Sequence, residues 1–348
     1  MIITRTPMRI SFFGGGTDYP VWYREHGGAV LSTTIDKCCY ITCRRLPPFF
    51  EYHSRISYSK VENVNNNVAI EHPSVRGCLQ FLGIDDGVEI HHVADLPART
   101  GLGTSSAFTV GLLLGLYALK NQMRDKHALA ADAIHVEQEV LQEAVGAQDQ
   151  VSAAHGGFNR INFNTDGSIE VNRILTAPHR LTELEQHLAL YFTGFSRTAS
   201  EIAKEQIRVT PQRKKELETM HQMVSEAEAI ITNPDRPIAE FGQMLHETWK
   251  LKRSLTQNIT SSSIDEIYEA GRGAGAIGGK LLGAGGGGFM LFFVPPERRA
   301  ALRARLKNLL CVPFEFSNRG SHVVVYEPEE VYDGSLTHER SQVYAQRV

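Results

Sequence analysis

The sequence predicts an α+β fold in two domains, and three observations lead to this prediction. Segments rich in β-branched and aromatic residues alternate with turn signals through the first half of the chain. Two helices interrupt these segments without the strict strand–helix–strand repeat of a doubly wound sheet. The second half is mostly helical before it returns to short strands. We place the boundary between residues 176 and 188, which gives domains at 1–180 and 181–348.

The first half contains four expected strand segments and two helices. The strand segments are RISFF (9–13), AVLSTTIDKCCYITC (29–43), GVEIHHV (87–93) and GFNRINF (157–163). The helices are expected from Ser105 to Gln122 and from Lys126 to Val145. Residues 44–76 hold prolines, asparagines and aromatic side chains, so we expect a long irregular excursion there.

The second half is expected to be helical from residue 196 to about 272, and its segment 216–231 has a clear amphipathic period. A glycine-rich stretch, a helix at 297–309 and strands at 312–317 and 322–327 should follow. Large aromatic side chains such as Trp249 should pack in the core of this half.

The composition narrows the class of protein. The chain has 348 residues, a formal net charge of -3, 42% hydrophobic and 22% charged residues, as in an ordinary globular protein. The absence of a basic excess argues against a nucleic-acid partner, and the longest apolar run, residues 108–119, is too short to cross a membrane. Five cysteines without metal spacing indicate reduced thiols in the cytoplasm. Whether the chain forms homo-oligomers stays open.

Glycines cluster in three segments that could bind an anion. They are FFGGGTDYP at residues 12–20, TGLGTSSA at 100–107 and GAGGGGF at 283–289. Glycines let backbone N–H groups approach a phosphate, and the second segment opens a long helix whose N-terminus favours negative charge. One such loop could equally be an ordinary helix start, but three favour a nucleotide site. The lysine of a P-loop is missing, and no segment opens a strand–helix–strand dinucleotide unit.

Two acidic residues could serve a phosphate site. Glu137 falls within an apolar stripe of the helix at 126–145, where a carboxylate is costly unless it is paired or bound to metal. It could also sit at the edge of that stripe and reach solvent. Asp149 could cap a short helix that begins at Gln150. Together with the serine-rich loop, however, the two carboxylates match the parts of metal-assisted phosphoryl transfer.

At this point the chain resembles the GHMP kinases. Their three motifs are similar to RTPMRISFFGGGTDYP (5–20), LPARTGLGTSSA (96–107) and KLLGAGGGGF (280–289), which occur here in the family's order. The resemblance implies an N-terminal domain like the second domain of ribosomal protein S5. It also implies a ferredoxin-like C-terminal domain, with ATP and a small-molecule acceptor in the cleft between the domains.

The resemblance also implies site residues. Asp149 would be the catalytic base or the group that orients the acceptor, with Arg9 beside it; Ser105 and Glu137 would bind Mg²⁺. The ATP phosphates would lie on the second motif, at Gly101, Leu102, Gly103, Thr104, Ser105 and Ser106. The acceptor would contact the first and third motifs, at Gly15, Gly16, Thr17, Asp18, Gly285 and Gly286.

The motifs also bear on the acceptor. Gly15 and Gly16 replace the Glu-His pair of galactokinases, which disfavours galactose. The residues of the first motif and of YFTGFSRTASEI (191–202) resemble the corresponding segments of bacterial kinases that phosphorylate the anomeric hydroxyl of a heptose 7-phosphate. A sugar phosphate needs a cationic receptor, and Arg197 is the first candidate, before Arg44, Arg45, Arg55 and Lys280. An unphosphorylated sugar such as fucose, or a non-catalytic sugar and ATP sensor, remains an alternative.

Overall fold

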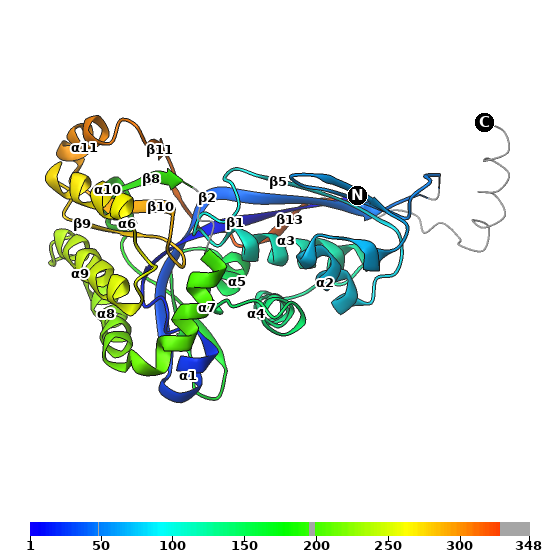
Figure 1. Cartoon of the computed structure of the whole chain (residues 1–348), viewed down its shortest axis with the longest axis horizontal. Helices are drawn as coiled ribbons and strands as arrows, with labels where there is room; N and C mark the ends of the chain where they lie inside the picture. Colours follow the sequence, from blue (N-terminus) through cyan, green and yellow to red (C-terminus); the bar gives the residue numbers. More distant parts are fainter. Residues whose placement is uncertain (48, 195–198, 328–348) are drawn as a thin grey trace.

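A computed structural model describes residues 1–47, 49–194 and 199–327 of the chain. The described residues form two sheets, each covered by helices, so the predicted α+β class is confirmed (Figure 1). One large sheet and its helices make an elongated body, and the smaller sheet packs at one end of it with the helices of the second half.

The large sheet is built around one long strand, β2. Its strands follow the order β13-β1-β2-β5-β3-β4, and β6, β7 and β12 join through β2 and β6. One part of β2 pairs with β6 and another with β5, while β1 runs antiparallel along most of its length. The strands are β1 (Ile2–Phe13), β2 (Gly28–Arg45), β3 (Ser54–Ser57), β4 (Val61–Val64), β5 (Val88–Ala94), β6 (Asn159–Phe163), β7 (Ile169–Arg173), β12 (Phe316–Ser317) and β13 (His322–Tyr326).

Four helices lie along one face of the large sheet (Figure 1). They are α2 (Pro73–Leu82), α3 (Thr104–Leu119), α4 (Lys126–His135) and α5 (Gln148–His155). The α3 sequence is apolar nearly all round, and residues 106–118 of it are buried, so α3 packs between the sheet and the other helices. The short α1 (Pro20–His26) follows β1 directly.

Two expectations for the first half are wrong in detail. The excursion at 44–76 contains a hairpin, β3 and β4, which extends the sheet because β3 pairs in parallel with β5. The helix expected to run to Val145 ends five residues earlier, because α4 continues into a π-helical turn at Val136–Val140 and the chain then leaves the helix. A π-helical turn holds more residues than an α-helical turn, so the side chains after it point in other directions than an α-helical period predicts.

The small sheet has the strand order β11-β8-β10-β9, all antiparallel. Numbered within the second half, this is order 4-1-3-2 with a β-α-β-β-α-β succession, which confirms the ferredoxin-like expectation. The elements are α6 (Pro178–Gln186), β8 (Leu188–Gly194), α7 (Ala199–Val209), η3 (Thr210–Gln212), α8 (Lys214–Thr232), α9 (Ala239–Leu255), α10 (Ser262–Gly273), β9 (Gly278–Leu281), β10 (Gly288–Phe293), η4 (Pro296–Arg298), α11 (Arg299–Arg305) and β11 (Leu310–Val312).

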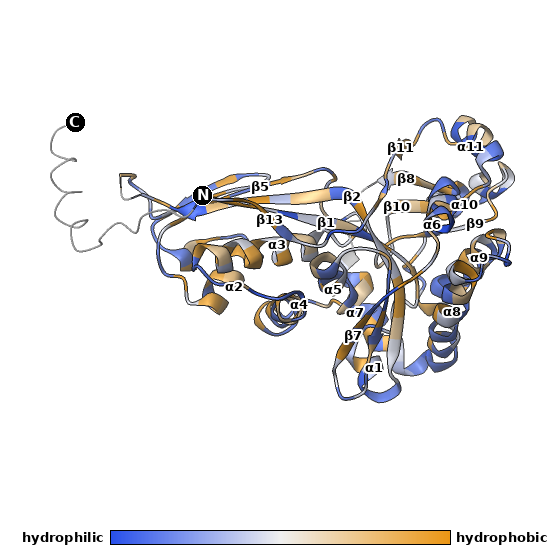
Figure 2. Cartoon of the chain, turned by 180° about the vertical axis from the view of Figure 1, so that it is seen from behind, coloured by the Kyte–Doolittle hydropathy of each residue, from blue (hydrophilic) through white to orange (hydrophobic). Residues whose placement is uncertain are grey.

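Hydrophobic residues fill the layer between sheet and helices. In Figure 2, β8 and β10 are coloured mainly hydrophobic, whereas α8 and α9 carry hydrophilic segments on their outer sides. All six residues of β10 are buried, and Trp249 on α9 is fully buried, as expected for a core aromatic. No helix within the described ranges is both long and apolar enough to cross a membrane.

The end of the described chain returns to the first sheet. β12 pairs with β2, and β13 pairs with β1 at the edge of the large sheet. The strand expected at 312–317 is therefore divided between the two sheets, as β11 and β12. The domain boundary near residue 180 stays a prediction, while residues 316–326 belong to the large sheet by their pairing.

Candidate active site

An ion pair between Arg9 and Asp149 lies where β1 passes the start of α5. Arg9 Nε donates to Asp149 Oδ1 at 2.7 Å and Arg9 Nη2 donates to Asp149 Oδ2 at 2.9 Å, which is a bidentate geometry. The Arg9 side chain is 5% exposed and that of Asp149 is 25% exposed, so the carboxylate remains accessible. The third guanidinium nitrogen, Nη1, donates to the carbonyl of Gly101 at 2.7 Å. Arg9 therefore links the predicted base, Asp149, to the second glycine-rich segment.

Asp149 is not a helix cap. The N-cap of α5 is Ala147, and Asp149 lies within the first turn of the helix. The capping interpretation is therefore wrong, since the carboxylate's hydrogen bonds go to Arg9.

The second glycine-rich segment ends at the N-terminus of α3. Gly103 is the N-cap, has a φ of 70°, and no side chain caps this end. A Cβ atom at Gly103 would lie 3.2 Å from Arg9 Cγ and 3.3 Å from Asp149 Oδ2. The ion pair therefore lies against the first turn of α3, where free N–H groups and the helix dipole favour an anion. Thr104 is half-buried and Ser105 is exposed at this end.

Glu137 is fully buried between α3 and α5. Ser106 Oγ donates to Glu137 Oε2 at 2.8 Å, and Gln150 Nε2 donates to the same oxygen. The other oxygen, Oε1, has no hydrogen-bond partner within the described ranges. Burial raises the pKa of this carboxyl to about 7, and the hydroxyls of Thr109 and Ser106 oppose the shift. The interpretation that Glu137 reaches solvent at the edge of a stripe is wrong.

The serine that contacts Glu137 is Ser106 and not Ser105. Ser105 is exposed at the start of α3, and its carbonyl accepts the Thr109 hydroxyl at 3.3 Å. The next residue along the helix points inward, toward the π-helical turn that carries Glu137. The role of Ser105 as a metal ligand stays a prediction, and Ser106 is the nearer candidate.

The oxygen atoms of Glu137 and Ser106 suit one hard metal cation. A buried carboxylate oxygen without a partner is costly, and Mg²⁺ binds carboxylate and hydroxyl oxygens. Across the part of the chain that is described, no three His, Cys, Asp or Glu side chains gather as a metal cage. Mg²⁺ usually takes one or two protein oxygens and leaves its other positions to phosphates and water. The residues present therefore fit a Mg²⁺ ion that arrives with a nucleotide.

The first glycine-rich segment forms a turn after β1 that Asp18 closes. Asp18 Oδ1 accepts the N–H of Gly16 at 2.9 Å, and Oδ2 accepts the N–H of Gln148 at 3.4 Å. Burial raises the pKa of Asp18, and the charge of Asp149 adds to this shift. The segment is thereby fixed to the turn of α5 that carries the candidate base.

Thr17 and Gly15 differ in what they offer a substrate. The Thr17 hydroxyl lies 2.8 Å from the carbonyl of Gly14 and 2.9 Å from that of Ala29, and it accepts the N–H of Ala29 at 3.1 Å. Thr17 therefore holds the turn together, and its contact with substrate stays a prediction. A Cβ atom at Gly15 would have Gln148 Nε2, at 3.7 Å, as its nearest neighbour, so there is room beside this glycine.

The third glycine-rich segment packs directly on the second. A Cβ atom at Gly101 would lie 2.4 Å from the Leu282 carbonyl oxygen, and one at Gly283 would lie 2.4 Å from Gly101 Cα. Both glycines have a positive φ, 82° and 74°. The N–H of Phe289 also donates to the Thr100 carbonyl at 3.2 Å. The two segments interlock through backbone atoms, which leaves no space for side chains at the contact.

Other predicted residues act here through their backbone. The N–H of Gly286 donates to the Ile259 carbonyl at 3.0 Å, and Gly285 packs against the backbone of Ile259. The Leu102 side chain is fully buried, and its carbonyl accepts the N–H of Arg9 at 3.0 Å. Substrate contacts at Gly285 and Gly286 stay predictions.

The cations considered for a substrate phosphate have different surroundings. Arg197 lies outside the described residues. Arg44 pairs with Glu89, and Arg45 pairs with Asp86, both on the part of β2 that runs along β5. Lys280 is buried and donates to the carbonyl of Phe12 at 2.8 Å, which connects β9 to β1.

Sequence reasoning missed two residues of the site. Gln150 follows the candidate base Asp149 by one residue and donates to Glu137. The sequence could have indicated it only through the apolar residues of the same short helix, which predict that one side of α5 is buried. Lys252, in WKLKRSL, donates to the carbonyls of Leu281 and Gly283. Basic residues in a mixed helix usually face solvent, so nothing in the pattern distinguished this lysine.

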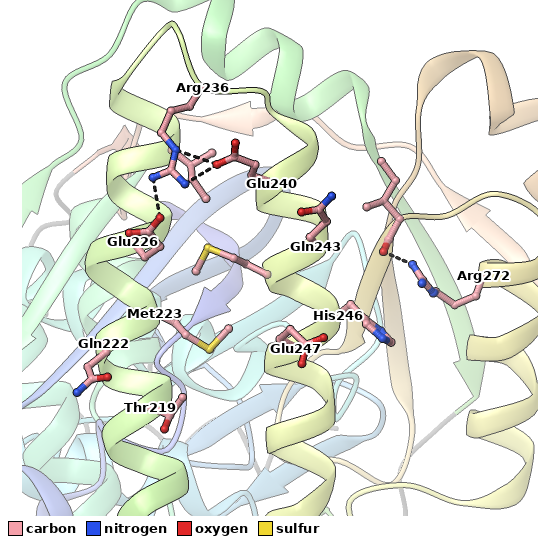
Figure 3. Close-up of a pocket in the computed structure, with 13 residues that line it drawn as sticks. Thr219, Gln222, Met223, Glu226, Arg236, Glu240, Gln243, His246, Glu247 and Arg272 are labelled. Carbon is pink, nitrogen blue, oxygen red and sulfur yellow. Dashed lines mark hydrogen bonds and ion pairs between the residues drawn. The ribbon is translucent and has the colours of Figure 1, made fainter.

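A surface groove between α8 and α9 is a separate feature. It has a volume of about 1180 Å³ and is crossed by the Arg236–Glu226 and Arg236–Glu240 ion pairs (Figure 3). None of the predicted site residues within the described ranges lines it. The candidate active site is instead the region where the three glycine-rich segments meet.

Comparisons with known proteins agree with this geometry. The profile of the GHMP kinases N terminal domain matches residues 72–157, and that of the GHMP kinases C terminal domain matches residues 226–310. The chain is 31% identical over 302 residues to D-glycero-alpha-D-manno-heptose 7-phosphate kinase of Campylobacter jejuni, covering 82% of this chain and 86% of the relative. It is 26% identical over 307 residues to bifunctional fucokinase/GDP-fucose pyrophosphorylase of Arabidopsis thaliana, covering 80% of this chain and 28% of that longer protein.

Solved structures share the fold. A crystal structure of a D-glycero-D-manno-heptose 1-phosphate kinase from Bacteroides thetaiotaomicron superposes with a TM-score of 0.74 at 24% identity, covering 96% of this chain and 100% of that one. With three glycine-rich segments around an arginine–aspartate pair, and with this identity and coverage, the chain belongs to the GHMP kinase family and is an ATP-dependent phosphotransferase.

Proposed function

We propose that the protein is a sugar 1-kinase that transfers the γ-phosphate of ATP to the anomeric hydroxyl of a sugar phosphate. The acceptor we favour is D-glycero-D-manno-heptose 7-phosphate, which would become the 1,7-bisphosphate on a route to surface polysaccharide. The relative named as a heptose 7-phosphate kinase supports this acceptor, because its 31% identity extends over 82% of the chain. Space at Gly15, where galactokinases carry a glutamate, is consistent with a different sugar.

The observation that carries the proposal is the Arg9–Asp149 pair at the N-terminus of α3. Phosphates held by the first turn of α3 would place the γ-phosphorus next to this pair. The anomeric oxygen would bond to that phosphorus while the bond to the bridging oxygen of ADP breaks, and its proton would go to the Asp149 carboxylate. Arg9 would hold Asp149 in position and offset negative charge that develops on the transferred group.

Ser106 and Glu137 would hold the Mg²⁺ ion that enters with ATP. Bound Mg²⁺ supplies neutralisation of charge on the phosphate oxygens. The buried Glu137 oxygen that lacks a partner supports this assignment, since a cation would satisfy it.

A panel of acceptors tests the substrate. ADP release would be measured with ATP, Mg²⁺ and, in turn, D-glycero-D-manno-heptose 7-phosphate, mannose 6-phosphate, mannose, fucose and galactose, with Asp149→Asn as the blank. We expect turnover with the phosphorylated heptose and little with mannose 6-phosphate, which lacks one carbon. Turnover on a plain hexose would keep the mechanism and refute the acceptor.

Fucose is the second candidate acceptor. The match to bifunctional fucokinase/GDP-fucose pyrophosphorylase covers 80% of the chain and favours it. ATP binding without turnover on any acceptor of the panel would instead favour a sugar and ATP sensor on the same fold.

A further inference from the structure

A lysine that faces away from solvent connects the second domain to the loops of the phosphate site. Lys252 lies in the last turn of α9, and its side chain is buried. Its Nζ donates to the carbonyl of Leu281 at 3.0 Å and to that of Gly283. Gly283 is the residue that packs on Gly101. Lys252 therefore holds the third glycine-rich segment at the point where it meets the second.

The segment is also held on its other side. The Ile259 carbonyl, beyond the end of α9, accepts the N–H of Gly286 at 3.0 Å. The segment between Gly283 and Gly286 is thus fixed at both ends by α9 and the residues that follow it. With its carbonyls bound by an ammonium group, a glycine-rich turn can direct its other N–H groups outward, as anion-binding turns do.

Lys252 belongs to a cluster of buried cations. The charge of Arg9 on β1 acts on Lys252, and the charges of Lys252 and Arg9 both act on Lys280 on β9. Arg9 pairs with Asp149, but in the described part of the chain neither lysine forms an ion pair, since both donate to carbonyls. Three buried cations with one carboxylate are an unbalanced arrangement, because burying a charge without a partner is unfavourable.

Burial of these lysines favours their neutral forms. Burial and the charge of Arg9 lower the pKa of Lys252 to about 7, and burial with the charges of Lys252 and Arg9 lowers the pKa of Lys280 well below its ordinary range. A polyanion next to Arg9 would reverse this effect, since a neighbouring negative charge favours the protonated amine.

We propose that Lys252 is a positioning residue for the nucleotide phosphates, which clamps the third glycine-rich segment onto the second and carries its full positive charge once the polyphosphate is bound. The proposal depends on the kinase activity of the family and not on the identity of the acceptor sugar. It also assigns to α9 a function in the site that its mixed sequence does not reveal.

The experiment measures ADP binding to the whole protein by calorimetry at about pH 8, where Lys252 is mostly neutral and ADP is fully ionised. Binding is measured in two buffers with different ionisation enthalpies, which gives the number of protons taken up. We expect the wild type to take up a measurable fraction of one proton per ADP. Because arginine stays protonated, Lys252→Arg should bind ADP with a smaller proton uptake, and any uptake that remains belongs to Lys280.

A second variant measures the clamp itself. Lys252→Met should raise the dissociation constant of ADP by at least about tenfold and raise the KM for ATP more than it lowers kcat. Lys250→Met is the matched control, since Lys250 lies on the same helix, is half exposed and pairs with Glu247. It should match the wild type in both affinity and proton uptake.

Two results would overturn the proposal. Wild-type protein that binds ADP without proton uptake would leave Lys252 as a purely structural residue, and this holds even if Lys252→Met fails to fold. A Lys252→Arg protein that takes up as many protons as the wild type would assign the uptake to another group. ADP alone is the ligand, so a wrong acceptor sugar cannot produce either result.

Discussion

At the scale of single residues, the carboxylate of Asp149 has the most direct role to test. Asp149→Asn keeps the shape of the side chain and one acceptor for Arg9 but removes the proton acceptor. We expect kcat to fall by at least about a hundredfold, with the affinity for ATP nearly unchanged. Steady-state kinetics and calorimetry measure the two quantities, and Asp235→Asn, at an exposed position between α8 and α9, is the control. Full activity in Asp149→Asn would remove this residue from the mechanism.

Glu137 allows a prediction about Mg²⁺. Glu137→Gln removes the buried charge but keeps a side chain of the same size beside Ser106 and Gln150. We expect the Mg²⁺ concentration for half-maximal activity to rise by at least about tenfold, because a carboxylate ligand is lost. Glu139→Gln changes an exposed neighbour on the same turn and should leave the Mg²⁺ titration unchanged. Equal titrations for the two variants would refute the ligand assignment.

Residues differ in how well the sequence predicts them. Glu137 could be proposed because a carboxylate on an apolar stripe is costly in a core. Asp149 alone looked like a helix cap, and its catalytic role followed from the resemblance to the GHMP kinases. Ser106 could not be distinguished from Ser105, because consecutive residues at a helix start differ only in the direction of their side chains. The role of Lys252 could not be predicted for a related reason, since its burial depends on a loop about 30 residues further along the chain.

At the scale of elements, the contact between the second and third glycine-rich segments makes a prediction. Gly101→Ala adds a Cβ atom 2.4 Å from a backbone oxygen at a φ of 82°, so the segments must separate. We expect a loss of about 1–3 kcal/mol in the free energy of unfolding and a higher KM for ATP. Urea unfolding and steady-state kinetics measure these changes.

The matched control is Gly273→Ala at the end of α10. A Cβ atom there would have no neighbour within 4 Å. Alanine should therefore be neutral or slightly stabilising at this position, since it is a better helix former than glycine. Similar losses in the two variants would mean that the interlocking contact is not what makes Gly101 necessary.

The elements themselves were predictable where their signal is local. The amphipathic period of α8 and the apolar run of α3 specify helices without reference to the rest of the chain. The π-helical turn at Val136–Val140 was not predictable, because its residues fit an α-helix equally well. The hairpin of β3 and β4 depends on pairing with β5, a partner about 35 residues away.

At the scale of the whole molecule, the two sheets share a buried junction. Phe12 and Phe13 on β1 contact Phe241 on α9, with ring centroids 5.3 and 5.0 Å apart. Lys280 reaches across the same junction to the carbonyl of Phe12. The sequence predicted two domains, but it could not predict this junction or the return of β12 and β13, because strand partners distant in sequence leave no local pattern.

The junction makes stability depend on pH through its lysines. The pKa of Lys252 is lowered from 10.5 to about 7 in the folded protein, through burial and the charge of Arg9. Between these pH values the unfolded chain holds a proton that the folded chain has released. The contribution of Lys252 to the free energy of unfolding therefore rises as pH increases through this window, by at most about 1.4 kcal/mol per pH unit.

Urea unfolding from about pH 7 to about pH 8.5 measures this slope and avoids the range in which buried thiols titrate. Burial raises the pKa of Cys39 and Cys78, so at higher pH the unfolded chain loses their protons first and the trend reverses. Lys252→Met has no proton to release at this position. Its slope of unfolding free energy against pH should therefore be smaller than that of the wild type, by up to about 1.4 kcal/mol per pH unit. Lys280, whose pKa is also lowered, contributes to both proteins and leaves the difference intact. Identical slopes in the two proteins would mean that Lys252 keeps its proton in the folded state, and the cation cluster would then be balanced by a group other than a bound phosphate.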